Sequence, residues 1–115
     1  MTAEKATQEC LELLKAFGLH DWTAWVCSNS AIASVNNGKA EGRDGGQLQG
    51  LTCFNIRAIF LSETYCEDDS QAWELIEHEV AHALSGDPEC ANSLRFDAAV
   101  KRIDTFYRDA ECQSK

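Results

Sequence analysis

The chain has 115 residues, of which 44% are hydrophobic and 25% are charged, and its formal net charge is −9 at pH 7. This composition excludes a wholly disordered chain, because it supplies enough apolar surface to offset the entropy lost on folding. The sequence contains no run of about 18 apolar residues, so we expect no membrane-spanning helix. The length is that of one ordinary domain, and we expect a single domain over residues 1–115.

The first 15 residues are charged and lack the apolar core of a secretory signal, which predicts a cytoplasmic protein. The 19 acidic residues outnumber the ten basic ones, and the basic residues form no contiguous block. Because such a surface repels a phosphate backbone, we expect no direct nucleic-acid partner. The six cysteines include no Cys-x-x-Cys pair, which disfavours a zinc ribbon, and without an export signal we expect them to be reduced.

Hydrophobic periodicity predicts a helix over residues 3–17, which ends at Gly18. Aromatic and β-branched residues then predict a strand over 22–28, and residues 31–35 a second, shorter strand. The stretch 36–50 holds five glycines and is expected to be a loop. Strand signal resumes over 51–61 and is strongest from Ile56 to Leu61.

Two further helices follow a connecting loop at 62–68. Asp68 with Gln71 is typical of a helix N-terminus, and Gly86 followed by Pro88 of a C-terminus, so we expect a helix over 69–85. An apolar stripe predicts another helix over 91–110. The order of elements favours a small α+β domain, in which an antiparallel sheet packs against helices.

The segment most informative about function is His78-Glu79-x-x-His82, inside the helix predicted over 69–85. Residues four apart lie on one helical face, so both imidazoles can bind a single Zn²⁺. Glu79, next to His78, is placed to act as general base on a water that the metal activates. This is the metalloprotease interpretation of the HExxH motif.

Other residues extend the match in the same order. Gly18-Leu19-x-x-Trp22 precedes a glycine-rich stretch, which is followed by Cys53, Ile59-Phe60-Leu61-Ser62, the motif and Gly86. Over roughly residues 10–103 the chain resembles the small SprT-like and phage-type metallopeptidases, a minimal zincin group. The resemblance implies an N-terminal helix, a short antiparallel sheet, the HExxH helix and a C-terminal helix. It also implies zinc-dependent hydrolysis of peptide bonds, with an edge strand that holds the substrate; residues 56–61 are the expected edge strand.

The third metal ligand departs from this pattern. The family places a third histidine about four residues before an aromatic residue, and if Phe96 is that aromatic, Asn92 takes the histidine's position. Asparagine is a poor zinc ligand, and no histidine follows His82. Because Glu89 lies just beyond the predicted helix, we predict that its carboxylate completes a His₂Glu site. The alternatives, in order, are Asp97, Cys90 and Asp87.

The sequence thus predicts a zinc metallopeptidase, with His78, His82 and Glu89 as ligands and Glu79 as the catalytic base. The expected partner is a peptide or an extended protein segment. The main alternative is a non-catalytic interaction or inhibitor protein from a phage or mobile element, which keeps the zincin-like scaffold. A further alternative is a structural zinc site that only stabilises the fold.

Overall fold

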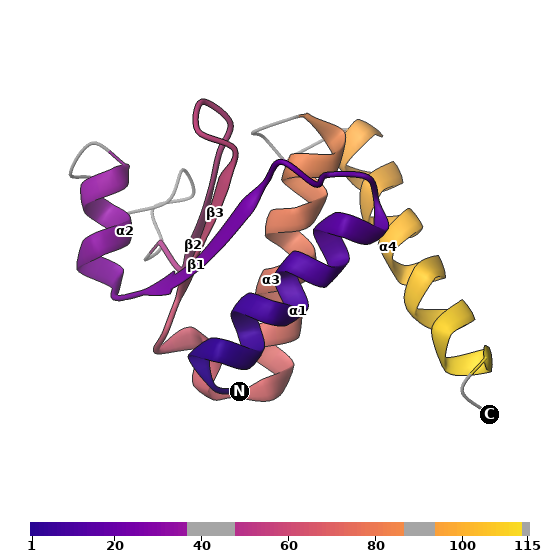
Figure 1. Ribbon diagram of the computed structural model, residues 1–115, viewed down its shortest axis with the longest axis horizontal. Coiled ribbons are helices and arrows are strands. Elements are labelled where there is room, and N and C mark those ends of the chain that lie inside the picture. The colour runs from indigo at the N-terminus through magenta and orange to yellow at the C-terminus, as the bar shows by residue number, and fades with distance from the viewer. Residues whose placement is uncertain (37–47, 87–93, 114–115) are drawn as a thin grey trace.

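The protein has an α+β fold, as predicted, and Figure 1 shows the three strands between α2 on one side and α1, α3 and α4 on the other. The computed structural model describes residues 1–36, 48–86 and 94–113. In chain order its elements are α1 (Ala3–Ala16), β1 (Thr23–Cys27), α2 (Asn29–Val35), β2 (Gly50–Cys53), β3 (Ala58–Ser62), the 3-10 turn η1 (Tyr65–Glu67), α3 (Asp69–Ser85) and α4 (Leu94–Gln113).

The sheet is mixed, and the expectation of an antiparallel sheet is wrong for one of its two pairings. Its strand order is β1-β3-β2. β2 and β3 are antiparallel, but β1 runs parallel to β3, with Thr23 opposite Ala58. Parallel neighbours need a crossover connection rather than a hairpin, and α2 lies in the connection between β1 and the other two strands.

The predicted strand over 51–61 is two strands joined by a turn. Cys53 lies opposite Ala58, and the Arg57 amide donates to the Phe54 carbonyl to close the turn. Arg57 adopts a positive φ of 50°, and its guanidinium pairs with Asp21. The pairing places β3 at the centre of the sheet, so the expectation that residues 56–61 form an edge strand is wrong.

The expected strand over 31–35 is also wrong, because these residues belong to helix α2. The Ser28 side chain accepts a hydrogen bond from the Ala31 amide and caps the helix. Ile32 is the buried residue of this helix. Five residues are too few for hydrophobic period to separate a strand from one or two helical turns, and the serine cap was the signal for a helix.

Helix α3 matches its predicted bounds at both ends. The Asp68 side chain accepts a hydrogen bond from the Gln71 amide, and Gly86 ends the helix in the left-handed conformation at φ 71°. Ile76 and Val80 are fully buried on the face that α1 and the sheet cover. Because both ends are fixed by local hydrogen bonds, the position of the HExxH residues along the helix is fixed too.

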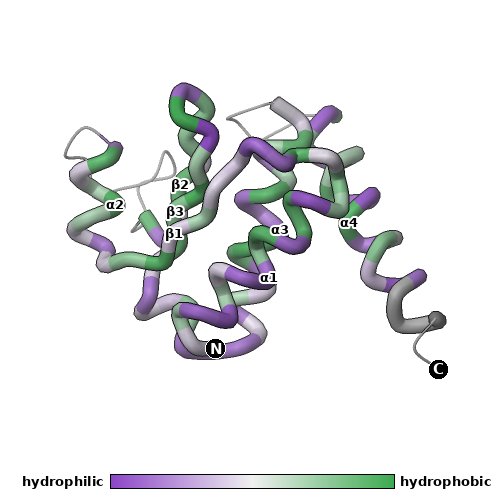
Figure 2. Tube along the Cα trace, viewed as in Figure 1, coloured by the Kyte–Doolittle hydropathy of each residue, from purple (hydrophilic) through white to green (hydrophobic). Residues whose placement is uncertain are grey.

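The two outer helices also match their predictions closely. α1 buries Ala6, Cys10, Leu13 and Leu14, and α4 buries Ile103 among others and packs along α3. Figure 2 shows hydrophilic and hydrophobic residues alternating along α1 and α4, as expected when one helical face is buried. Residues 91–93 of the predicted helix over 91–110 lie outside the described residues. In the part of the chain that the structure describes, no helix combines the length and the apolar character needed to cross a membrane.

The fold predicts a clear order of thiol reactivity. Cys10 is fully buried, and burial raises its pKa to about 12, with the Glu79 carboxylate adding to the shift. Because the thiolate is the reactive form, Cys10 should be alkylated only as fast as the protein unfolds. Cys53 is partly exposed and should react at least tenfold faster; mass spectrometry of iodoacetamide-treated native protein measures both rates. Equal rates at the two positions would contradict this arrangement of the core.

Candidate metal centre

The two histidines of the motif lie one turn apart on α3 and face each other. Their Nε2 atoms are 3.1 Å apart, and their ring centroids are 4.7 Å apart. The His82 side chain is buried, with 7% of its surface exposed, whereas His78 is exposed. The pair is therefore anchored on its inner side and open to solvent on its outer side.

This geometry fits a shared metal ion. Two nitrogens that bind one tetrahedral Zn²⁺ at about 2.0–2.1 Å lie about 3.3 Å from each other, close to the 3.1 Å observed. A carboxylate oxygen of Glu79 belongs to the same group, whose three ligand atoms all lie within 4.8 Å of one another. Among the described residues, this is the one group of at least three histidine, cysteine or acidic side chains that could hold a metal.

Phe96 of α4 holds the two imidazoles from the other side. Its ring centroid lies 5.2 Å from that of His78 and 4.7 Å from that of His82. Only 7% of Phe96 is exposed, so the ring fills the space between the two helices. In the sequence Phe96 was only a marker for an expected ligand, whereas in the structure it packs directly against both histidines.

Glu79 points to the inner side of α3, toward strand β2. The Thr52 hydroxyl lies 3.0 Å from the Glu79 carbonyl oxygen and 3.3 Å from Oε2 of its carboxylate, and can donate to either. Gly50 allows this close approach, because a Cβ there would lie 2.7 Å from Leu75 and 3.2 Å from the Glu79 side chain. Glu79 is therefore 5% exposed yet hydrogen-bonded.

Without a bound ion, desolvation shifts the pKa values of both Glu79 and His78. It raises the pKa of the Glu79 carboxyl to about 8, although the hydrogen bond from Thr52 acts in the opposite direction. The pKa of His78 is lowered, first by partial desolvation of its ring, which neighbouring side chains cover on its inner side, and then by the adjacent His82. A neutral imidazole is the form that binds metal, so the surroundings of His78 favour its ligating state.

Sequence reasoning identified His78, Glu79 and His82 but not the groups that support them. Thr52 and Gly50 lay in the predicted strand and loop without a marked role; the Gly-x-Thr spacing, which puts both residues on one face of a strand, was the available signal. His20 is exposed beyond the end of α1.

The predicted third ligand, Glu89, lies outside the described residues, as do Asp87 and Cys90. Asp97 is exposed on α4 and is not a member of the three-residue group. No protein-family model, curated protein or solved structure matches the chain.

The buried Glu79 carboxyl predicts a pH dependence of stability in the metal-free protein. Its pKa is about 8 in the folded state and about 4.5 when unfolded, so unfolding releases a proton between these values. Stability should then fall as pH rises, by up to about 1.4 kcal/mol per pH unit from this group. In chelator-treated protein, Glu79→Gln should match the wild-type melting temperature at pH 5 and exceed it by at least about 4 °C at pH 8.5.

Glu74→Gln is the matched control, because it makes the same change at an exposed position of α3. It should leave the difference between the two pH values as in the wild type. A Glu79→Gln protein that melts below the wild type at pH 8.5 would show that the carboxylate is not buried as described.

Proposed function

We propose that the protein is a zinc-dependent metallopeptidase. The observation that supports this function is the pair of facing His78 and His82 Nε2 atoms, 3.1 Å apart, with the Glu79 carboxylate in the same group. Histidine pairs at this spacing bind zinc, and the acidic residue between them is the usual general base of the HExxH motif. The exposed outer side of His78 leaves room for a substrate to approach.

Each residue of the site has a separate role in the proposed hydrolysis. His78, His82 and, by our sequence prediction, Glu89 hold the ion, which when bound supplies a Lewis acid that activates water and polarises the scissile carbonyl. When the Thr52 hydroxyl donates to Glu79 Oε2, Oε1 is left as the proton acceptor. Oε1 would take a proton from the attacking water and return it to the departing amine, so that hydrolysis yields a carboxylic acid and an amine.

Strand β2 replaces residues 56–61 as the proposed substrate-binding edge. The Ser62 amide donates to the Gln49 carbonyl, so Gln49 faces β3 and, by the alternation of an antiparallel ladder, Gly50 and Thr52 direct their backbone groups outward. In the described part of the chain no strand pairs with this outer edge. An extended substrate would pair there beside Glu79, and backbone pairing gives affinity with little sequence selectivity.

Metal content and activity test this function together. Protein purified without chelators should carry about one zinc per chain, and His78→Ala or His82→Ala should each lose it. Glu79→Gln should retain the metal but lose at least about 100-fold in cleavage of casein or a quenched-fluorescence peptide library, as expected when a general base is removed.

Two controls isolate the site from general damage to the protein. His20→Ala removes the one histidine outside the motif and should leave zinc content unchanged. Glu77→Gln makes the same chemical change as Glu79→Gln two residues away and should leave cleavage unchanged. If the wild-type protein binds zinc but cleaves none of these substrates, the peptidase proposal fails and the non-catalytic alternative replaces it. If it binds no zinc at neutral pH, the peptidase and the structural-zinc hypotheses both fail.

The identity of the third ligand gives a separate prediction. Loss of groups that merely support a ligand costs about 10–100-fold in metal affinity, so Glu89→Gln should weaken zinc binding by more than about 100-fold in a competition assay with a fluorescent chelator. Asp97→Asn, which alters an exposed carboxylate on α4, should leave the affinity unchanged. Weakening by Asp97→Asn alone would exclude Glu89 as the ligand.

A further inference from the structure

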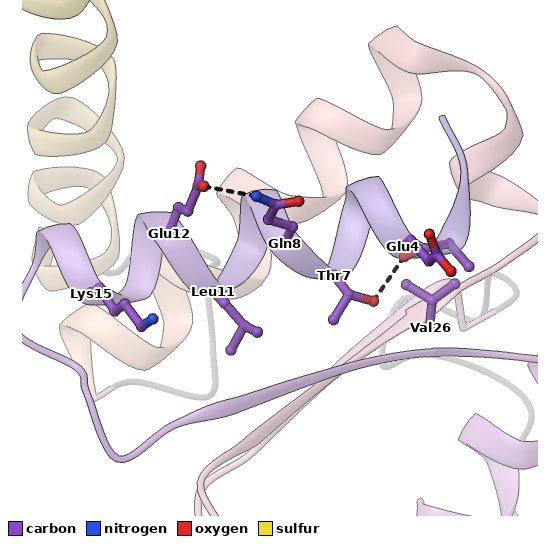
Figure 3. Close-up of a pocket in the computed structure, with 8 residues that line it drawn as sticks. Glu4, Thr7, Gln8, Leu11, Glu12, Lys15 and Val26 are labelled. Carbon is purple, nitrogen blue, oxygen red and sulfur yellow. Dashed lines mark hydrogen bonds between the residues drawn. The ribbon is translucent and has the colours of Figure 1, made fainter.

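A groove lies between α1 and β1, at the opposite edge of the sheet from β2. It measures about 500 Å³, and its lining comprises seven residues of α1 and Val26 of β1. Figure 3 shows Leu11 and Val26 directed into the gap between helix and strand, with Glu4 next to Val26, Lys15 at the other end of α1, and Glu12 projecting from the upper side of the helix. We call it the α1–β1 groove.

The groove runs along an unpaired strand edge. Thr23 donates its amide to the Arg57 carbonyl, and the Glu63 amide donates to the Cys27 carbonyl, so residues 23 and 27 face β3. Because parallel strands alternate, the N–H and C=O groups of Ala24 and Val26 point away from β3, toward the outer edge. β1 is an edge strand of the described sheet, and no described residue pairs with those four groups.

The opposite face of the same strand carries an exposed aromatic side chain. Trp25 is 56% exposed, and its indole N–H donates to the Thr23 hydroxyl at 3.1 Å, which fixes the ring along the strand. Trp25 and Val26 are neighbours in a strand, so one lies on each face. An added strand would therefore meet Trp25 with one set of alternating side chains and the α1 flank with the other. Exposed tryptophans are favoured anchors in protein interfaces.

The negative charge of the groove favours a basic segment as the added strand. Glu4 and Glu12 lie along it against the single cation Lys15, and Gln8 donates to Glu12 and holds its carboxylate at the α1 surface. The chain as a whole carries −9, so a second copy of this acidic surface would be repelled. A segment with lysine or arginine at alternate positions would place its cations on Glu4 and Glu12.

We propose that the α1–β1 groove binds an extended basic segment of a partner protein, which adds as a fourth strand beside β1. Its backbone pairs with Ala24 and Val26, its cationic side chains face α1, and its apolar side chains cover Trp25. The groove lies beside β1, and β2 with the HExxH residues lies at the other edge of the sheet. This binding therefore does not depend on the proposed zinc chemistry.

The probe is a blocked heptapeptide of alternating lysine and valine, titrated into ¹⁵N-labelled full-length chain carrying Glu79→Gln, which prevents its consumption by the proposed peptidase. We expect saturable binding, with the largest shifts at the amides of Ala24 and Val26. Two control peptides test whether binding depends on strand pairing and on charge. N-methylation of alternate residues blocks strand pairing, and glutamate in place of lysine reverses the charge; each should weaken binding at least tenfold.

Substitutions in the protein test the same surface. Val26→Pro removes an outward N–H that β3 does not use, and Glu12→Lys reverses a charge in the groove; each should weaken binding about tenfold or more. Glu74→Lys makes the same charge change on α3, outside the groove, and should leave the affinity within twofold. The N-methylated peptide keeps the test decisive if Val26→Pro fails to fold.

The remaining outcomes overturn the proposal. They are the absence of saturable binding, equal affinity for the N-methylated peptide, and an effect of Glu74→Lys as large as that of Glu12→Lys. Shifts confined to Gly50 and Thr52 would place the peptide on β2, and a dimer in sedimentation that loses its stability with Val26→Pro would assign the β1 edge to a second copy.

Discussion

The contact between strand β2 and the middle of helix α3 is the constraint on which the candidate metal centre depends. At this point the Thr52 hydroxyl reaches both the backbone and the carboxylate of Glu79, and the missing side chain of Gly50 allows the strand to approach. A buried carboxyl without a partner would be costly, and a solvated one would be free to turn away. The contact therefore fixes Glu79 next to the two histidines at the cost of a raised pKa for its carboxyl.

The histidines are fixed by a different part of the fold. Phe96 packs against both rings, so the orientation of the pair depends on the packing of α4 along α3. The site thus has two supports, one from the sheet and one from the C-terminal helix, and only α3 contributes the residues of the motif. This division explains why the inner side of the group is rigid and buried while the outer side of His78 remains exposed.

Local signals allowed the prediction of α1, α3 and α4, because caps, glycine stops and helical period are all encoded within a few residues. The same signals placed His78, Glu79 and His82 correctly on one helix. The errors concern short or non-local features: residues 31–35 are too short for their period to identify a helix, and nothing in residues 56–61 shows that β3 is central. Thr52 and Phe96 meet the motif from other elements of the fold, and no pattern in the sequence shows that either residue contacts it.

The arrangement of the sheet has a consequence for how the chain folds. β2, β3 and α3 are close in sequence, with only the short turn η1 between β3 and α3, and Thr52 meets Glu79 across 27 positions. By contrast, Thr23 of β1 pairs with Ala58, 35 positions further on, and only after a crossover. Contacts that close shorter loops form sooner. The topology therefore favours early docking of the β2–β3 hairpin on α3, with the parallel strand joining a framework that already holds the Glu79 carboxylate in place.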